Sequence, residues 1–245
     1  STFAPPGGPT IAAGPLVVVG RVYAPNLLIA ELGGPLTVAE DGVPLATATW
    51  SLAHASLRLE DITGTPRPGL ASLAIENGTL AGAGGATAAA KLVEAHVRPT
   101  PDDASRVDVA VTATEATAAG LPPTDLRLMF AANRSALERL VAGQPLPDDG
   151  LVLDVQEASA TRGETRISAS GTLEVGNDGL VDGRLEITTA DPAGLAALIA
   201  PLLPPDDPLP AAIAGAVAGF GRPTEIDGTK AVRVTLDIAR SRVTI

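Results

Sequence analysis

The sequence predicts a β-rich α+β fold, in which a curved antiparallel sheet carries a few short helices on one face or at one end. Apolar and polar residues alternate with a period of two along most of the chain, which is typical of half-buried strands. Turn dipeptides such as Asp41-Gly42 favour antiparallel hairpins. Only three short segments follow the period of 3.6 that predicts a helix. With 245 residues, of which 45% are hydrophobic, the chain can bury a sizeable core.

The N-terminal part is expected to hold a lead-in followed by strands. Residues 1–15 are rich in Pro, Gly and Ala, so we interpret them as irregular, and residues 16–245 as a single β-rich body. Aliphatic and β-branched runs bounded by Gly and Pro then predict strands over residues 16–19, 26–32, 36–38 and 45–59.

The middle of the chain is also expected to be strand. Residues 70–80 fit one or two strands, with Asn77-Gly78 as a turn. Residues 88–97 contain helix-favouring Ala, Lys and Glu, but the segment is short, is stopped by a proline and alternates in its second half. We therefore favour a strand there. Clean alternation predicts two more strands over residues 107–111 and 126–130.

Three short helices are expected among the C-terminal strands. Ser135 opens a capping box that predicts a helix closed by Gly143. The Asp191-Pro192 pair predicts the start of a second helix, and a third is predicted to run up to Phe220. Any division of the body into two subdomains is expected near residues 133–150. Further strands are predicted over residues 151–155, 166–175, 183–187, 232–238 and 243–245.

The residue inventory argues against several classes of function. Seventeen Lys and Arg against 28 Asp and Glu give a net charge of −11, which disfavours a nucleic-acid partner. The chain has no Cys and only two His, so thiol nucleophiles and multi-histidine metal sites are absent. The glycine-rich residues 82–85 lack the phosphate-loop pattern, and no serine lies in a nucleophile-elbow context. We therefore expect no catalytic residues, no metal, no cofactor and no enzymatic activity.

The residues that do suggest a site are apolar. Small aliphatic side chains dominate and aromatic residues make up 2% of the chain, so a curved sheet of this composition can leave an apolar groove. The leucine-rich stretch after Asp191 is either a lid over that groove or a helix packed over the open end of the sheet. It carries no Lys or Arg, which disfavours insertion at a membrane surface. The candidate groove residues are Leu195, Leu198, Ile199, Leu202, Trp50 and Leu52.

Three stretches of the sequence resemble the motifs of a known family. Residues 23–38 (YAPNLLIAELGGPLTV) resemble its Pro-Asn, strand, Gly-Pro and strand pattern, and residues 53–58 (AHASLR) resemble a second strand motif. Residues 170–173 (SGTL) and 182–185 (DGRL), separated by a turn, resemble its hairpin. The chain is thereby identified as similar to domain-of-unknown-function family 2125, exported proteins of alphaproteobacteria that are distantly similar to AsmA-type proteins.

The resemblance implies a β-rich body in the periplasm and a connection to envelope lipids, with no catalytic residues to carry over. It also implies that a segment outside this chain anchors such a body to the inner membrane. Our leading expectation is a non-catalytic envelope protein that binds or shuttles an apolar ligand, a lipid. The alternative is a structural or interaction module that engages another envelope protein through a sheet edge.

Overall fold

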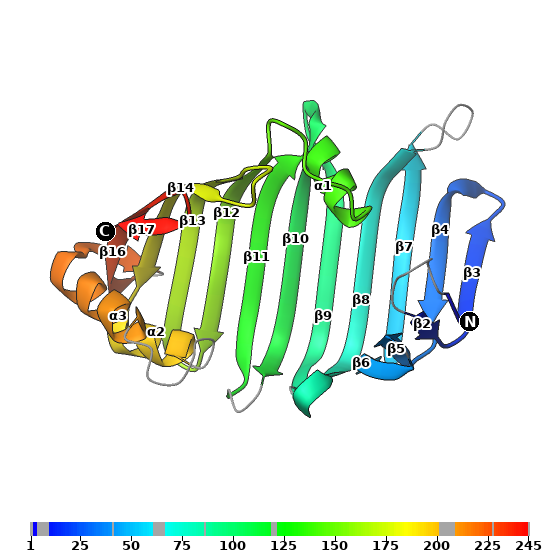
Figure 1. Ribbon diagram of the computed structural model, residues 1–245, viewed down its shortest axis with the longest axis horizontal. Helices are drawn as coiled ribbons and strands as arrows, with labels where there is room; N and C mark the ends of the chain where they lie inside the picture. The colour runs from blue at the N-terminus through cyan, green and yellow to red at the C-terminus, as the bar shows by residue number, and fades with distance from the viewer. Residues whose placement is uncertain are drawn as a thin grey trace. The chain divides into compact units, whose positions relative to one another are not determined.

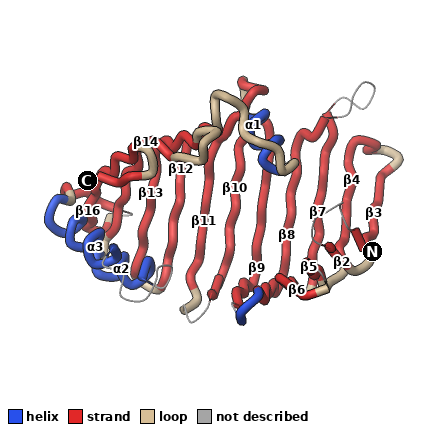
Figure 2. Tube along the Cα trace, in the orientation of Figure 1, coloured by secondary structure: helices blue, strands red, loops and turns tan. Residues whose placement is uncertain are grey.

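The computed structural model describes residues 2–3, 10–40, 42–60, 67–85, 87–118, 122–200, 209–226 and 228–244 (Figure 1). Strands account for 71% of the protein and helices for 11%, and Figure 2 shows how little of the trace is helical. Every strand pair with a defined register is antiparallel. The predicted β-rich α+β class with antiparallel pairing and a few short helices is therefore confirmed.

The chain divides into two compact units. Unit 1 comprises Ser1–Arg98 and Ala110–Asp125, and unit 2 comprises Pro99–Val109 and Leu126–Ile245. The strand β10 (Asp103–Ala118) contributes residues to both. The chain thus passes between the units ahead of residues 133–150, where the sequence suggested a division.

Unit 1 consists of strands and one short 3₁₀ helix. Strands β3, β4, β7, β8 and β9 pair in that order and lie side by side in Figure 1. A second series pairs in the order β1, β2, β5, β6 and β8. The elements that lie wholly or mostly in unit 1, apart from β10, are β1 (Thr2–Phe3), β2 (Thr10–Ala13), β3 (Leu16–Arg21), β4 (Ala24–Leu32), β5 (Leu36–Glu40), β6 (Val43–Thr49), β7 (Leu52–Glu60), β8 (Arg67–Gly82), η1 (Ala83–Gly85) and β9 (Thr87–Thr100).

The sheet of unit 1 forks at Trp50, which corrects two strand predictions. The single strand expected over residues 45–59 is interrupted at Trp50 and Ser51, giving β6 and β7, which pair with successive parts of β8. Asn77, expected in a turn, instead adopts a φ of 50° within the continuous strand β8. Its side-chain amide donates to Ser51 Oγ over 2.9 Å, so the break in one strand is bonded to the irregularity in the next.

The lead-in also differs from its prediction. Residues 10–13 form β2, which pairs with β5 from Thr10 opposite Ala39 to Ala13 opposite Leu36. The composition of this segment favours irregular structure, but pairing with a strand more than twenty residues away satisfies its backbone polar groups.

Unit 2 combines a four-strand ladder, β12, β13, β14 and β16, with the three α-helices of the described residues. Helices α2 and α3 pack on each other and against β13 and β16 (Figure 1). No helix among the described residues is long and apolar enough to cross a membrane. The elements that lie wholly or mostly in unit 2, apart from β10, are β11 (Thr124–Asn133), α1 (Arg134–Val141), β12 (Leu151–Arg162), β13 (Thr165–Val175), β14 (Val181–Thr189), α2 (Pro192–Ile199), α3 (Leu209–Phe220), β15 (Arg222–Ile226), β16 (Thr229–Ala239) and β17 (Arg242–Thr244).

Two of the helix termini show how the sequence sets them. Asp191 caps α2 as predicted, since its carboxylate accepts from the Gly194 amide over 2.8 Å. The capping box at Ser135 does not set the start of α1, because the N-cap is Asn133. The Asn133 side chain does not cap the helix and instead bonds across to β12, accepting from the Val152 amide over 3.0 Å.

Candidate functional site: an apolar sheet face

In the central part of the five-strand ladder in unit 1, one face carries no polar side chain, and we call this part the apolar face. Asn26 of β4 and Lys91 of β9 continue the same alternation and mark where it ends. Residues directly opposite in an antiparallel ladder share a face, so the registers define its members. For example, Val18 lies opposite Ala30, which lies opposite Ala55, which lies opposite Leu73. The full set is Leu16, Val18, Gly20, Leu28, Ala30, Leu32, Ala53, Ala55, Leu57, Ala71, Leu73, Ile75, Val93, Ala95 and Val97.

The opposite face of the same strands is polar where β4, β7, β8 and β9 meet. Glu31 lies opposite His54, and Ser56 lies opposite Ser72, with their hydroxyls 2.8 Å apart. His96 lies opposite Ser72 on the next strand. The registers therefore place both histidines on this polar face. Within the part of the chain that the structure describes, no group of three potential metal ligands forms.

The apolar face is poorly covered. Among the described residues of unit 1, Ala53 is the only buried hydrophobic residue. Leu16, Val18 and Leu73 remain 57%, 55% and 38% exposed. Gly20 is also exposed, and the other members except Ala53 are half-buried. Contiguous exposed apolar surface of this kind marks a site for a ligand or a partner in soluble proteins.

Unit 2 has a comparable apolar face, but its helices cover much of it. Leu195 of α2 and Val217 of α3 pack against Val234 and Leu236 of β16. Ala136 of α1 packs with residues from the ends of β11 and β12 in a second cluster. Both units have a sheet face of small and aliphatic side chains, but among the described residues only in unit 2 do α-helices pack on that face and bury it.

The candidate groove residues on α2 do not gather around an open groove. Leu195 is 3% exposed and belongs to the core under α2 and α3, as expected for a helix packed over a sheet. Leu198 and Ile199 lie in the last turn of α2, but their side chains are outside the described residues, as is Leu202.

Trp50 and Leu52 also lie away from the apolar face. The half-buried Trp50 ring donates from Nε1 to the Leu32 carbonyl over 2.8 Å and packs near Gly34, so it fixes the fork of the sheet. Leu52 lies opposite Glu76, on the polar side of β7. The apolar residues that follow Leu52 at alternate positions along β7, Ala53, Ala55 and Leu57, are the ones that face the site.

A shallow cleft of about 320 Å³ lies at the ends of β8, β9 and β10 in unit 1. Its volume is at the lower limit of typical small-molecule pockets, about 300–1,000 Å³. It is too small to enclose a whole lipid. The cleft is lined by Thr79, Leu80, Ala81, Thr87, Ala88, Ala89, Thr117 and Ala118.

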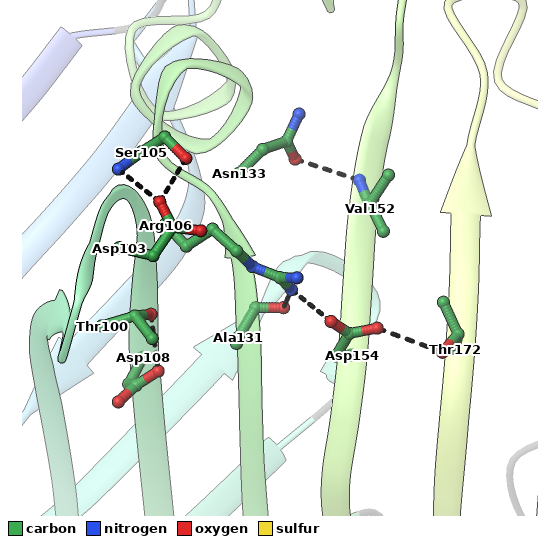
Figure 3. Close-up of polar contacts among 10 residues, drawn as sticks. All are labelled: Thr100, Asp103, Ser105, Arg106, Asp108, Ala131, Asn133, Val152, Asp154 and Thr172. Carbon is green, nitrogen blue, oxygen red and sulfur yellow. Dashed lines mark hydrogen bonds and ion pairs between the residues drawn. The ribbon is translucent and has the colours of Figure 1, made fainter.

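The polar face of unit 2 carries a row of cross-strand contacts, shown in part in Figure 3. Arg106 forms an ion pair with Asp154 and donates to the Ala131 carbonyl over 3.3 Å. Thr172 donates to the same carboxylate over 3.1 Å, and Arg184 lies opposite Thr172 on the next strand. Charges of both signs alternate along this row, which is typical of a solvated sheet face rather than a site for a charged ligand.

Alternation in the sequence could have identified the apolar face, but its strands had to be aligned. On any one strand, three small apolar residues at alternate positions indicate only a buried face. The continuous surface becomes visible once Val18, Ala30, Ala55, Leu73 and Ala95 are placed in one row by their registers.

Comparison with known proteins gives one result. A search of curated proteins and a search of solved structures found no match to this chain. A family model described as "Uncharacterized protein conserved in bacteria (DUF2125)" matches residues 2–245. The match covers nearly the whole chain, and the protein therefore belongs to this family, as its strand and turn motifs predicted.

Proposed function

We propose that the protein is a non-catalytic carrier that binds an apolar ligand, the acyl chain of a lipid, along the apolar face of unit 1. The observation that carries the proposal is that the central part of this face, across five strands, has no polar side chain, and that Ala53 alone of its members is buried. A periplasmic location, which the sequence resemblance implies, would place this face among envelope lipids that it could hold or shuttle.

The side chains of the face suit a flexible chain better than a protein anchor. Five of its members are alanines, at positions 30, 53, 55, 71 and 95, so the surface offers few deep pockets. Protein interfaces concentrate their energy in aromatic or arginine anchors that fill such pockets. An acyl chain needs only continuous contact, and each buried methylene contributes about 0.8 kcal/mol.

The free energy gained per buried methylene determines how long a bound acyl chain must be. Ten buried methylenes contribute roughly 8 kcal/mol. Association costs about 4–15 kcal/mol in lost freedom of motion. Burial of a short acyl chain therefore does not offset the cost of association, and the affinity for a fatty acid is expected to rise steeply with the length of its acyl chain.

The test compares one substitution on the two faces of neighbouring strands. Leu73→Gln places an amide on the apolar face at a half-exposed position, and Leu52→Gln places the same amide on the polar face. Binding of a fluorescent C16–C18 fatty acid should weaken about tenfold for Leu73→Gln, a loss of about 1.4 kcal/mol. Leu52→Gln should bind as the wild type does.

Native mass spectrometry of the purified chain provides a second readout. Lipid that copurifies in stoichiometric amount supports the proposal. Equal probe affinity for both variants, or no binding by the wild type, contradicts it. The alternative, in which a sheet edge engages another envelope protein, rests on β3, whose outer edge pairs with no other described strand.

A further inference from the structure

The strand β3 is an exposed, uncharged edge. It pairs only with β4 among the described strands, and Figure 1 shows it outermost in unit 1. Leu16, Val17, Val18 and Val19 are each more than half exposed, so both faces of the strand meet solvent. Alternate backbone N–H and C=O groups on its outer edge are therefore available to another strand.

This edge lacks the features that keep sheet edges from pairing. Natural edge strands carry charged residues, prolines or bulges that block added strands. From Leu16 to Gly20, β3 contains neither a charged residue nor a proline, and its one register shift comes at its end, between Gly20 and Arg21. The strand is thus open to a partner that is also an uncharged apolar strand.

We propose that β3 pairs antiparallel with β3 of a second copy of this chain, about a twofold axis at Val18. In this register Val18 faces Val18 of the second copy, Val17 faces Val19, and Leu16 faces Gly20. The largest side chain thereby meets the smallest. A Cβ built on Gly20 would meet only the Leu28 side chain, at 4.0 Å, so Leu16 of the second copy has room there.

The same register avoids pairing like charges and makes the apolar faces of the two copies continuous. Arg21 would fall opposite Pro15 of the second copy, so no like charges are paired, and a proline without an N–H ends the ladder. Directly opposite residues share a face, so Val18 of each copy stays on the same side. The apolar face then continues across the dimer from one copy into the other.

The interface is small, and this sets the expected behaviour. Six residues of β3 place it at the low end of protein interfaces, so the dimer should be concentration-dependent. Each copy carries a net charge of −11, and repulsion between copies is screened by salt. Self-association should therefore strengthen between 20 mM and 500 mM salt, opposite to a contact held by ion pairs.

Charge variants on the polar side of β3 test the register. Val17→Lys places a charge opposite Val19, and Val19→Glu places one opposite Val17, so each variant alone should lose about tenfold in association. Mixing the two variants pairs Lys with Glu across the interface and Val with Val, which should restore association. Val17→Lys lies opposite Glu31 within the same chain, so β3 should remain on β4.

Sedimentation velocity of the full chain measures these changes. The matched control mixes Val17→Lys with Val43→Glu, a substitution at an exposed position on β6, and should restore nothing. The wild type is expected to shift toward twice the chain mass as concentration and salt rise.

A cysteine scan gives the geometry directly, because the chain has no cysteine of its own. Facing residues in an antiparallel pair have Cα atoms about 4.5–5.5 Å apart. This spacing lies within the range that a disulfide spans. Val18→Cys should therefore form a disulfide-linked dimer under mild oxidation, whereas Val43→Cys, at a slightly more exposed position, should not.

Two outcomes would overturn the inference. One is a wild type that stays monomeric at several hundred micromolar in high salt, which would leave the edge to a different protein. The other is a dimer that neither Val17→Lys nor Val19→Glu weakens. Neither outcome bears on the lipid proposal, because the fatty-acid assay reads Leu73 and can be run on the monomeric variants.

Discussion

Gly171 on β13 and Gly183 on β14 lie diagonally across one ladder, and each lies where a carbonyl of the other strand leaves no room for a side chain. A Cβ on Gly171 would lie 2.1 Å from the Arg184 oxygen, and a Cβ on Gly183 would lie 2.2 Å from the Thr172 oxygen. Both glycines have φ near +145°, a conformation that side chains rarely adopt. The two strands therefore approach more closely here than a ladder with side chains would allow.

Substituting Gly171 with alanine is expected to destabilise the protein strongly. The methyl group would collide with backbone, which cannot move aside as a side chain can, and the positive φ adds strain. We expect Gly171→Ala to lower the free energy of unfolding by about 3 kcal/mol or more, measured by urea denaturation. The control, Gly163→Ala, also has a positive φ of 58° but meets nothing within 4 Å. It should cost only about 1 kcal/mol, and equal costs would contradict the backbone collision.

Truncating Leu195 tests whether α2 belongs to the core. Leu195→Ala would leave a cavity among Val217, Val234 and Leu236, and is expected to cost about 2–5 kcal/mol in thermal or urea unfolding. Leu140→Ala on α1 removes the same atoms from a side chain that is 51% exposed, and should change the free energy of unfolding by no more than about 0.5 kcal/mol. A mild effect at Leu195, with unit 2 still melting normally, would restore the interpretation of α2 as a lid.

The contact of Arg106 with Asp154 is expected to couple their contributions to stability. Their side chains are 29% and 40% exposed, so solvent screens the pair only in part. A double-mutant cycle with Arg106→Met and Asp154→Asn should give a coupling of about 1 kcal/mol. The same cycle on Lys91 and Glu115, which are 64% and 55% exposed, should give a smaller coupling, because solvent screens an exposed pair more strongly. A larger coupling for the more exposed pair would show that burial does not determine the coupling energy of these ion pairs.

Asp103 provides a pH-dependent contact. The hydroxyl of Ser105, and next its backbone amide, donate to the Asp103 carboxylate and hold its pKa below the usual 3.8. Because the folded pKa is lowered, the stabilisation is present above pH 3.8 and is lost as the pH falls through the folded value. Ser105→Ala should raise the pKa of Asp103 toward 3.8 in a carboxyl-detected NMR titration. An unchanged midpoint would show that the hydroxyl contributes nothing.

Much of the fold follows from local pattern, and the exceptions depend on distant partners. The strands at residues 107–111 and 166–175 alternate clearly enough to be predicted, and Asp191 caps its helix by a contact three residues away. In contrast, the break at Trp50 depends on a hydrogen bond to Leu32, eighteen residues earlier. Asn133 is drawn away from capping by Val152, on the next strand.

The candidate site was harder to predict for the same reason. The alternation of residues along β7 places Leu52 on one face and Ala53 and Ala55 on the other, but it does not show which face has no helix packed on it. That depends on where helices pack, and the helices of unit 2 bury Leu195 there. Hydrophobicity alone pointed to the leucine-rich helix, whereas the exposed surface is built of smaller residues on strands.

The scarcity of buried side chains in unit 1 has a calorimetric consequence. The heat capacity of unfolding comes from apolar surface that water reaches only after unfolding. Surface already wet in the folded state adds nothing to it, so unit 1 should contribute less heat capacity per residue than unit 2, where Leu195, Val217 and Leu236 are buried. A ligand or partner that covers Val18, Leu73 and their neighbours removes this surface from water and so raises the heat capacity of unfolding. The free energy of unfolding of the occupied protein should therefore curve more sharply with temperature than that of the empty protein.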